Sequence, residues 1–255
     1  MTDEQIVQAL WNCHLQGDSF PDAWKGKLDL EQAYRVQLGL LDMKLAHGEQ
    51  QAGWKVGLTA DAMREMFGGK EPVFGHLLES GSRPSGHTFA VSGMRDAMVE
   101  NEILITMGQD VPGPDATLAD ARQAMASIAP AFEIVELRGA DMRVDLPLAM
   151  TDNVAQHAFV HGEPIDLLPD FDFDAIRAEV RVNGEVVDDA LGGEVMDNQV
   201  QTVAWLANML HRYGRRLQAG QRIMSGSFTK PVPVKAGDTV ETLFIGVGTV
   251  AASFT

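Results

Sequence analysis

The chain contains one cysteine, Cys13, among its 255 residues, so it cannot form an internal disulfide. This scarcity is typical of proteins kept in a reducing compartment. Residues 1–18 are acidic and lack the basic and apolar segments of a secretory signal. No apolar run approaches the roughly 18 residues needed to cross a bilayer. We therefore expect a cytoplasmic protein that does not enter a membrane.

Basic residues are also scarce, with 20 Lys and Arg against 36 Asp and Glu and a net charge of −16. This surplus of negative charge repels a phosphate backbone, so nucleic acid is not an expected partner. If the substrate is itself an anion, the site needs a local source of positive charge. A bound divalent cation is the simplest such source.

Several common catalytic motifs are absent. The sequence has neither a G-x-S-x-G nucleophile elbow nor a G-x-x-x-x-G-K-[ST] phosphate-binding loop. His157 and His161 are four residues apart, but in an extended segment they would lie about 13 Å from each other. A nucleophilic serine of the elbow type, a P-loop and a zinc pair at these histidines are therefore not predicted.

Hydrophobic spacing indicates an α+β fold. Apolar residues recur every three or four positions in the first fifty residues and predict helices, with Asp29 as the N-cap of the second. From Gly53 the pattern alternates and predicts a half-buried strand. Further strands are predicted at Met98–Met107, Ala131–Leu137, Val154–Val160, Ala178–Val182, Arg222–Ser225, Thr239–Ile245 and Val247–Phe254. Helices are predicted at Thr117–Ser127 and Val200–Arg212.

We therefore expect a mixed β-roll or β-sandwich core with helices on the outside. An N-terminal helical region, residues 1–75, would pack on a β-rich core, residues 76–255, and the two would form one structural unit.

Two glutamates in the segment Val99–Ile105 are candidate ligands of a cation. In a strand, Glu100 and Glu102 lie on the same face, about 7 Å apart along the chain. Two carboxylates on one partly apolar face repel each other unless a cation or a shared proton compensates. The alternative is a solvated strand edge, which the spacing alone also allows.

A third carboxylate favours the metal interpretation. Glu133 alternates with Val135 and Leu137, so a strand here places it in an apolar row, where a lone charge is costly. Glu136, on the opposite face, is an equal candidate from periodicity alone. Three oxygen ligands with open coordination positions suit Mg²⁺ or Mn²⁺.

Lys55 is a further residue that could carry chemistry. It lies between Gly53 and Gly57, which allow close backbone approach, although a solvated lysine is the simpler interpretation. The segment Met224–Pro231 follows a predicted strand and offers hydroxyls and exposed amides. This segment either holds a substrate carboxylate or forms an ordinary turn.

Together these segments resemble the fumarylacetoacetate hydrolase superfamily, and within it the branch of 2-keto-4-pentenoate hydratases and 4-oxalocrotonate decarboxylases. The resemblance covers nearly the whole chain. The segments that carry it are GWKVGLT (53–59), FGHL (74–77), ENE (100–102), PAFEIVE (130–136), TDN (151–153), VAWLANML (203–210) and SGSFTKPVPVKAGD (225–238).

The resemblance implies a function and a set of site residues. Glu100, Glu102 and Glu133 would bind the divalent metal, and Lys55 would act on the substrate. Candidate substrate-binding residues are Asp152, Asn153, Ser225, Ser227 and Thr229. The family also implies homo-oligomers.

The implied substrate is a small 2-oxo or 2-hydroxy acid, and the implied reaction is hydration of a 2-hydroxy-2,4-dienoate to a 4-hydroxy-2-oxo acid. The SGSFTKP segment is more similar to the hydratases than to the decarboxylases. The alternatives are a metal-dependent decarboxylase of a 2-oxo diacid, an acylpyruvate-type hydrolase and a catalytically inactive partner subunit.

Overall fold

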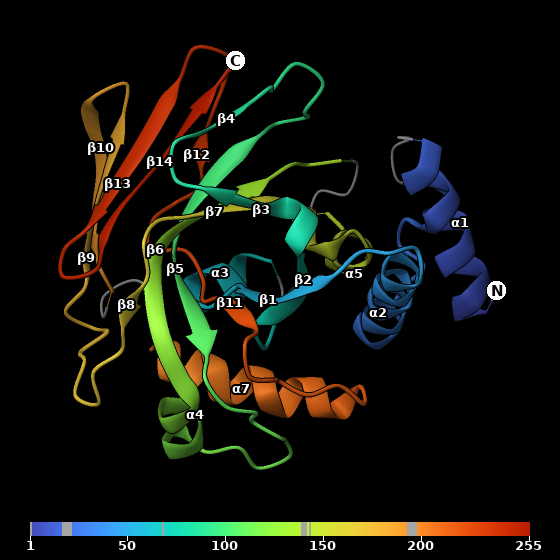
Figure 1. Cartoon of the computed structure of the whole chain (residues 1–255). Helices are drawn as coiled ribbons and strands as arrows, with labels where there is room; N and C mark the ends of the chain where they lie inside the picture. Colours follow the sequence, from blue (N-terminus) through green and yellow to red (C-terminus); the bar gives the residue numbers. More distant parts are fainter. Residues whose placement is uncertain (1, 17–21, 68, 139–141, 143, 193–197) are drawn as a thin grey trace.

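Two β-sheets form the body of the molecule, and helices lie around the outside (Figure 1). The structure is a computed structural model, and it describes residues 2–16, 22–67, 69–138, 142, 144–192 and 198–255. The helices are α1 (Asp3–Gln16), α2 (Leu30–Ala46), α3 (Asp61–Met66), α4 (Leu118–Ala124), α5 (Leu146–Thr151) and α7 (Gln199–Arg212). Short 3₁₀ turns are η1 (Asp22–Trp24), η2 (Glu79–Gly81) and η3 (Asn153–Ala155).

The larger sheet has nine strands and carries the candidate site. Its order is β2 (Val73–Leu78), β1 (Gln51–Gly57), β11 (Arg222–Met224), β5 (Met98–Met107), β6 (Met125–Val135), β7 (Gln156–His161) and β3 (Ser82–Pro84), with β12 (Val232–Pro233) on β5 and β8 (Ile165–Asp166) on β6. The β1–β11 and β3–β7 pairs are parallel, whereas β5, β6 and β7 are antiparallel neighbours. The sheet is therefore mixed.

The smaller sheet has five strands. Its order is β10 (Glu185–Leu191), β9 (Arg177–Val182), β13 (Thr239–Phe244), β14 (Gly248–Phe254) and β4 (His87–Phe89). Val99 and Phe132 of the larger sheet and Val180, Phe244 and Val250 of the smaller one belong to a single buried cluster. The two sheets thus share one hydrophobic core, which confirms the predicted mixed β-sheet architecture.

Local sequence signals explain where the helices begin. The Asp29 carboxylate accepts a hydrogen bond from the Gln32 N–H and caps α2, as predicted. Thr117 and Asp120 form a capping box at the start of α4. The predicted helix at Val200–Arg212 is confirmed as α7, which buries Val203, Leu206 and Leu210.

Other predicted boundaries were wrong. Helix α4 ends at Ala124 rather than Ser127, and β6 begins directly at Met125 rather than at Ala131. From Ile128 onward β6 is buried on both faces, so it lacks the alternation that marks a half-buried strand. Strand β1 was also predicted to be half-buried, but Ala52–Val56 are all buried, so both faces of the strand are covered.

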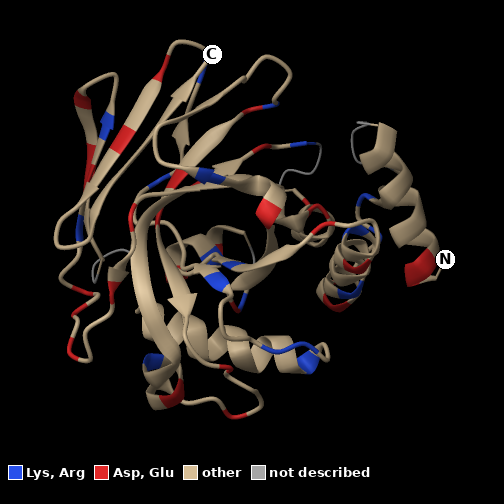
Figure 2. Cartoon of the chain, viewed as in Figure 1, with Lys and Arg blue, Asp and Glu red and all other residues tan. Residues whose placement is uncertain are grey.

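The N-terminal region is only partly helical. The predicted division between residues 1–75 and 76–255 falls inside β2, and both β1 and β2 belong to the nine-stranded sheet. Helices α1 and α2 pack against each other, and α2 also contacts α5. In the part of the chain that the structure describes, no helix is both long enough and apolar enough to cross a bilayer. Acidic positions occur on helices, strands and loops alike (Figure 2).

Gly53 allows the close approach of β1 to β11, and its replacement tests this packing. A Cβ atom at Gly53 would lie 1.9 Å from the Arg222 carbonyl oxygen, and the backbone φ of +154° is already unfavourable for other residues. Gly53→Ala should therefore lower the free energy of unfolding, measured by urea denaturation, by about 3 kcal/mol or more.

Gly214→Ala is the matched control. Its φ of +68° also favours glycine, but nothing lies within 4 Å of the added Cβ, so we expect a loss of only about 1 kcal/mol. Equal losses in the two variants would show that the close approach of the strands is not the constraint.

Candidate active site

A cavity of about 640 Å³ opens beside β1 and β5. Lys55 and Glu100 form part of its wall, together with Ser227 and Thr229 from the segment after β11. Much of the remaining wall is apolar. This combination of an apolar cavity and a few convergent polar groups is typical of a binding site for a small molecule.

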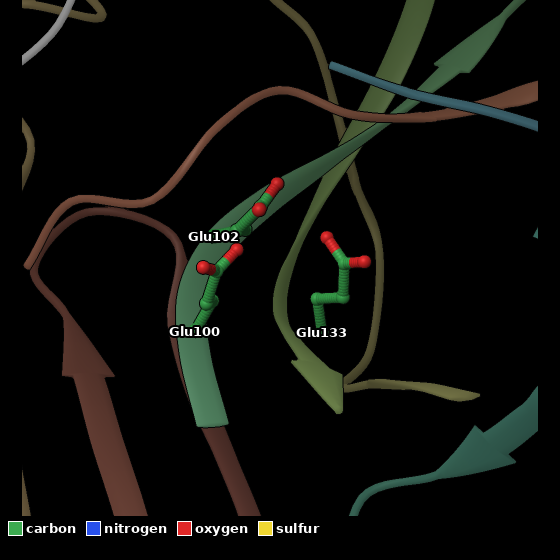
Figure 3. A group of neighbouring side chains, drawn as sticks. All are labelled: Glu100, Glu102 and Glu133. Carbon is green, nitrogen blue, oxygen red and sulfur yellow. The ribbon is translucent and has the colours of Figure 1, made fainter. Parts of the chain in front are cut away.

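Three glutamates converge beside this cavity. Glu100 and Glu102 lie on one face of β5, and the strand register places Glu133 of β6 directly opposite Glu100. One carboxylate oxygen from each lies within 4.8 Å of the others. Figure 3 shows the three carboxylates turned toward one another from two neighbouring strands. Glu100 and Glu102 thus share one face of β5, as their spacing of two residues predicts.

Burial makes this cluster electrostatically unfavourable by itself. Glu102 and Glu133 are each only 1% exposed. Burial raises the pKa of Glu133 to about 7, even though Lys55 acts in the opposite direction. Burial, followed by the nearby Glu133 and Glu100 carboxylates, raises the pKa of Glu102 well above its usual range. The Gly226 N–H donates a 2.8 Å hydrogen bond to Glu102 Oε2, which offsets only part of this cost.

Lys55 extends from β1 to the same cluster. Its Nζ lies 2.9 Å from Glu133 Oε1 and donates a 3.0 Å hydrogen bond to the Val154 carbonyl oxygen. The lysine is only 3% exposed, which excludes the solvated-lysine interpretation. Burial disfavours the charged ammonium, but Glu133 and Glu100 outweigh it and raise the pKa of Lys55. Lys55 therefore remains a cation inside the protein.

A strained turn positions the carbonyl group that Lys55 contacts. Asn153, Val154 and Ala155 have φ values of 57°, 54° and 61°, a left-handed conformation that costs about 1–3 kcal/mol at each non-glycine residue. The Asn153 side chain stabilises this turn because it accepts from the His76 N–H at 2.7 Å and donates to the His76 carbonyl at 2.8 Å. The turn replaces the start of the strand predicted at Val154, and β7 begins only at Gln156.

Glu136 lies in a different cluster. Its carboxylate contacts the His157 ring at 3.1 Å and the Arg138 guanidinium at 3.7 Å, and accepts from the Arg95 N–H at 3.2 Å. Glu136 does not belong to the glutamate cluster formed by Glu100, Glu102 and Glu133. Periodicity left Glu133 and Glu136 as equal candidates for the third carboxylate, and the structure places only Glu133 beside Glu100 and Glu102.

The candidate substrate-binding residues fall into two groups. Ser227 and Thr229 line the cavity, and both contact Asn101 through hydrogen bonds. Ser225 does not line it, because it is fully buried and donates to the Ile103 carbonyl.

Asp152 and Asn153 also lie outside the cavity wall. The Asp152 carboxylate pairs with Arg138 at 3.0 Å, and burial raises its pKa to about 6. The Asn153 side chain forms hydrogen bonds with the N–H and carbonyl groups of His76. Neither side chain therefore reaches the cavity directly.

Sequence reasoning missed the apolar residues of the cavity. Met63 and Phe67 come from α3 and its C-terminal end, and Met98 and Leu137 come from β5 and the end of β6. Only Met98 carried a signal, because it lies two residues before Glu100 and therefore shares its strand face. The others depend on tertiary contacts.

The glutamate cluster fits a divalent cation. Its three side chains offer only oxygen ligands, the type that Mg²⁺ and Mn²⁺ prefer. Glu133 Oε1 is buried and lies near Lys55, yet accepts no hydrogen bond of regular geometry. Burial is the main cause of the raised pKa values of these carboxyl groups, and a cation here would stabilise their charged forms and neutralise their mutual repulsion.

Comparisons with known proteins find relatives that cover most of the chain. A 2-hydroxyhexa-2,4-dienoate hydratase from Comamonas testosteroni is 32% identical over 231 residues, which cover 90% of this chain and 88% of that protein. A 2-keto-4-pentenoate hydratase from Paraburkholderia xenovorans is 29% identical over 258 residues, covering 98% and 94%.

A solved structure shares the whole fold. The 4-oxalocrotonate decarboxylase from Pseudomonas putida G7, complexed with magnesium and adipate, superposes with a TM-score of 0.93 at 28% identity, covering 100% of this chain and 99% of that one. The family described as the fumarylacetoacetate (FAA) hydrolase C-terminal domain matches residues 63–255. As its motifs predicted, the chain belongs to the fumarylacetoacetate hydrolase family.

Proposed function

We propose that the chain is a divalent-metal-dependent hydratase. It would add water to a 2-hydroxy-2,4-dienoate, or its 2-oxo-alkenoate tautomer, to give a 4-hydroxy-2-oxo acid in the catabolism of aromatic compounds. The observation that carries this proposal is the convergence of three carboxylates and the buried Lys55 beside one cavity. Relatives that are named hydratases support the type of reaction.

Glu100, Glu102 and Glu133 would hold the cation, Mg²⁺ or Mn²⁺, as they are the oxygen ligands that the site offers. When bound, the ion supplies positive charge that stabilises the negative charge developing on the substrate's 2-oxygen. This also resolves the conflict between an anionic substrate and a chain whose net charge is −16.

The chain's own residues would orient the substrate and move protons. Lys55 is charged, buried and part of the cavity wall, so it can bind the substrate carboxylate or transfer a proton near the reacting carbons. The hydroxyls of Ser227 and Thr229 lie on the same wall. Each already donates to a backbone carbonyl, Ser227 to Thr229 at 2.8 Å and Thr229 to Lys230 at 3.2 Å, so each would accept a hydrogen bond from a substrate hydroxyl or turn its proton to a substrate oxygen. The apolar part of the wall limits the water around the substrate and strengthens these polar contacts.

Decarboxylation of a 2-oxo diacid is the second candidate. The observation that favours it is the solved decarboxylase, which shares the whole fold with a TM-score of 0.93. An acylpyruvate-type hydrolase and an inactive partner subunit have less support, and a partner subunit has no need for a buried glutamate cluster. Assembly into a homo-oligomer and a cytoplasmic location stay predictions.

The products distinguish the two reactions. The Mg²⁺-loaded protein should convert 2-hydroxypenta-2,4-dienoate to 4-hydroxy-2-oxopentanoate, followed by NMR, and should release little CO₂ from 2-oxohex-3-enedioate. Glu102→Gln should lose Mn²⁺ binding in calorimetry and lower kcat/KM by on the order of 10²-fold or more. It should still fold, since the substitution removes a buried like charge.

Glu136→Gln is the matched control, because Glu136 contacts His157 and Arg138 rather than the glutamate cluster. It should retain Mn²⁺ binding and turnover. Rapid CO₂ release without hydration would favour the decarboxylase, and full Mn²⁺ affinity in Glu102→Gln would refute the metal assignment.

Lys55→Met tests the second part of the site. Loss of the ammonium should lower kcat/KM by on the order of 10²–10⁴ with Mg²⁺ saturating, because a group that binds the substrate anion or transfers a proton is removed. The metal-free variant should also unfold at a lower temperature than wild type, since Glu133 loses its buried partner. Saturating Mg²⁺ should remove most of this difference between the unfolding midpoints of the variant and wild type.

The exposed Lys235 provides the control, and Lys235→Met should change neither the rate nor the midpoint appreciably. If Lys55→Met kept the wild-type rate, Lys55 would have no role in turnover. If the unfolding midpoint of Lys55→Met stayed far below that of wild type with Mg²⁺ saturating, the role of Lys55 would be structural.

A further inference from the structure

The cavity wall beyond the glutamate cluster is apolar on two sides. Met98 lies two residues before Glu100 on the same face of β5, and the strand register places Val135 of β6 opposite Met98. Met63 and Phe67, from α3 and its end, also line the cavity. A substrate whose carboxylate and 2-oxygen lie at the glutamate cluster would therefore extend its tail along thioether, aliphatic and aromatic side chains.

The charged groups of the cavity do not favour a second carboxylate. Among the described residues that line it, the cations are Lys55 and Lys230, and the anions are Glu100, Asp188 and Asp189. Lys55 contacts Glu133 and the Val154 carbonyl, and the proposed function assigns it to the first carboxylate of the substrate or to proton transfer, so it does not serve a second carboxylate on the tail. Lys230 is exposed to solvent, where an ion pair contributes little. A tail carboxylate would thus lose water without gaining a buried cation.

We propose, resting on the hydratase function above, that the site selects 2-hydroxy-2,4-dienoates with an apolar tail over those with a carboxylate at the end of the tail. Met98 is a specificity-determining residue for this choice. It lies on the same strand face as Glu100 and contributes to the wall of the cavity. Burial of an apolar tail improves binding by about fourfold per methylene group, whereas a buried unpaired carboxylate opposes binding.

The test compares two substrates of equal carbon number. These are 2-hydroxyhepta-2,4-dienoate, which has an ethyl tail, and 2-hydroxyhepta-2,4-diene-1,7-dioate, which has a carboxymethyl tail. With Mg²⁺ saturating, kcat/KM for the monoacid should exceed that for the diacid by on the order of 10²-fold. A ratio at or below one in the wild-type protein would overturn the proposal.

Variants locate the source of the preference. Met98→Lys adds a cation to the apolar wall and should reduce the monoacid-to-diacid ratio at least about tenfold, mainly through a lower KM for the diacid. Met98→Leu keeps the wall apolar and should preserve the ratio. Mn²⁺ binding by each variant checks that the glutamate cluster is still assembled. If Met98→Lys bound Mn²⁺ but left the ratio unchanged, Met98 would not determine specificity.

A binding experiment separates this inference from the proposed reaction. The saturated acids 2-oxoheptanoate and 2-oxoheptanedioate have no alkene to hydrate, and their Kd values for the Mn²⁺-loaded protein can be measured by calorimetry. Tighter binding of the monoacid by at least about tenfold would support the preference even if no dienoate were hydrated. Equal or tighter binding of the diacid would contradict it whether or not the hydratase reaction occurs.

Discussion

The close approach of three carboxylates, two of them fully buried, is the constraint on which the rest of this site depends. Strand register alone brings Glu100, Glu102 and Glu133 together, because two share a face of β5 and the third lies opposite on β6. In a low-dielectric interior such a group holds protons or binds a cation. Burial raises the pKa of all three glutamates, neighbouring carboxylates raise those of Glu102 and Glu133 further, and the single ammonium of Lys55 offsets only part of this.

The surrounding backbone is shaped to hold Lys55 in this cluster. Gly75 lies opposite Lys55 in the β1–β2 pair, and a Cβ there would approach the Asn153 Oδ1 to 2.7 Å and the Lys55 side chain to 3.1 Å. The absence of that atom lets Asn153 bind the His76 backbone and stabilise the left-handed turn through Val154. A turn of three consecutive left-handed residues is thus placed where the Val154 carbonyl group contacts the candidate catalytic lysine.

Those parts of the site that rest on local periodicity could be predicted from the sequence, and those that rest on distant neighbours could not. Period-two spacing predicts that Glu100 and Glu102 share a face, but it leaves Glu133 and Glu136 equivalent until the register with β5 is known. In the sequence Lys55 resembles a solvated residue, because the groups that its ammonium contacts, the Glu133 carboxylate and the Val154 carbonyl, are far away in the chain. The β-branched side chain of Val154 favours a strand. The turn found there is explained by the hydrogen bond from Lys55 to the Val154 carbonyl and by the hydrogen bond from the His76 N–H to the Asn153 side chain.

The unfolding midpoint with and without Mg²⁺, measured from about pH 5 to about pH 8, tests the central claim most directly. The metal-free fold keeps the Glu133 proton until about pH 7, whereas the unfolded chain releases it near the ordinary value of 4.5, so this group lowers metal-free stability as the pH rises between these values. Bound Mg²⁺ replaces the proton, and the stabilisation by metal should therefore be small at pH 5 and large at pH 8. Asp152 and His76 titrate with and without metal, so the difference between the two midpoints isolates the glutamate cluster. Equal midpoints with and without Mg²⁺ at pH 8 would contradict the account.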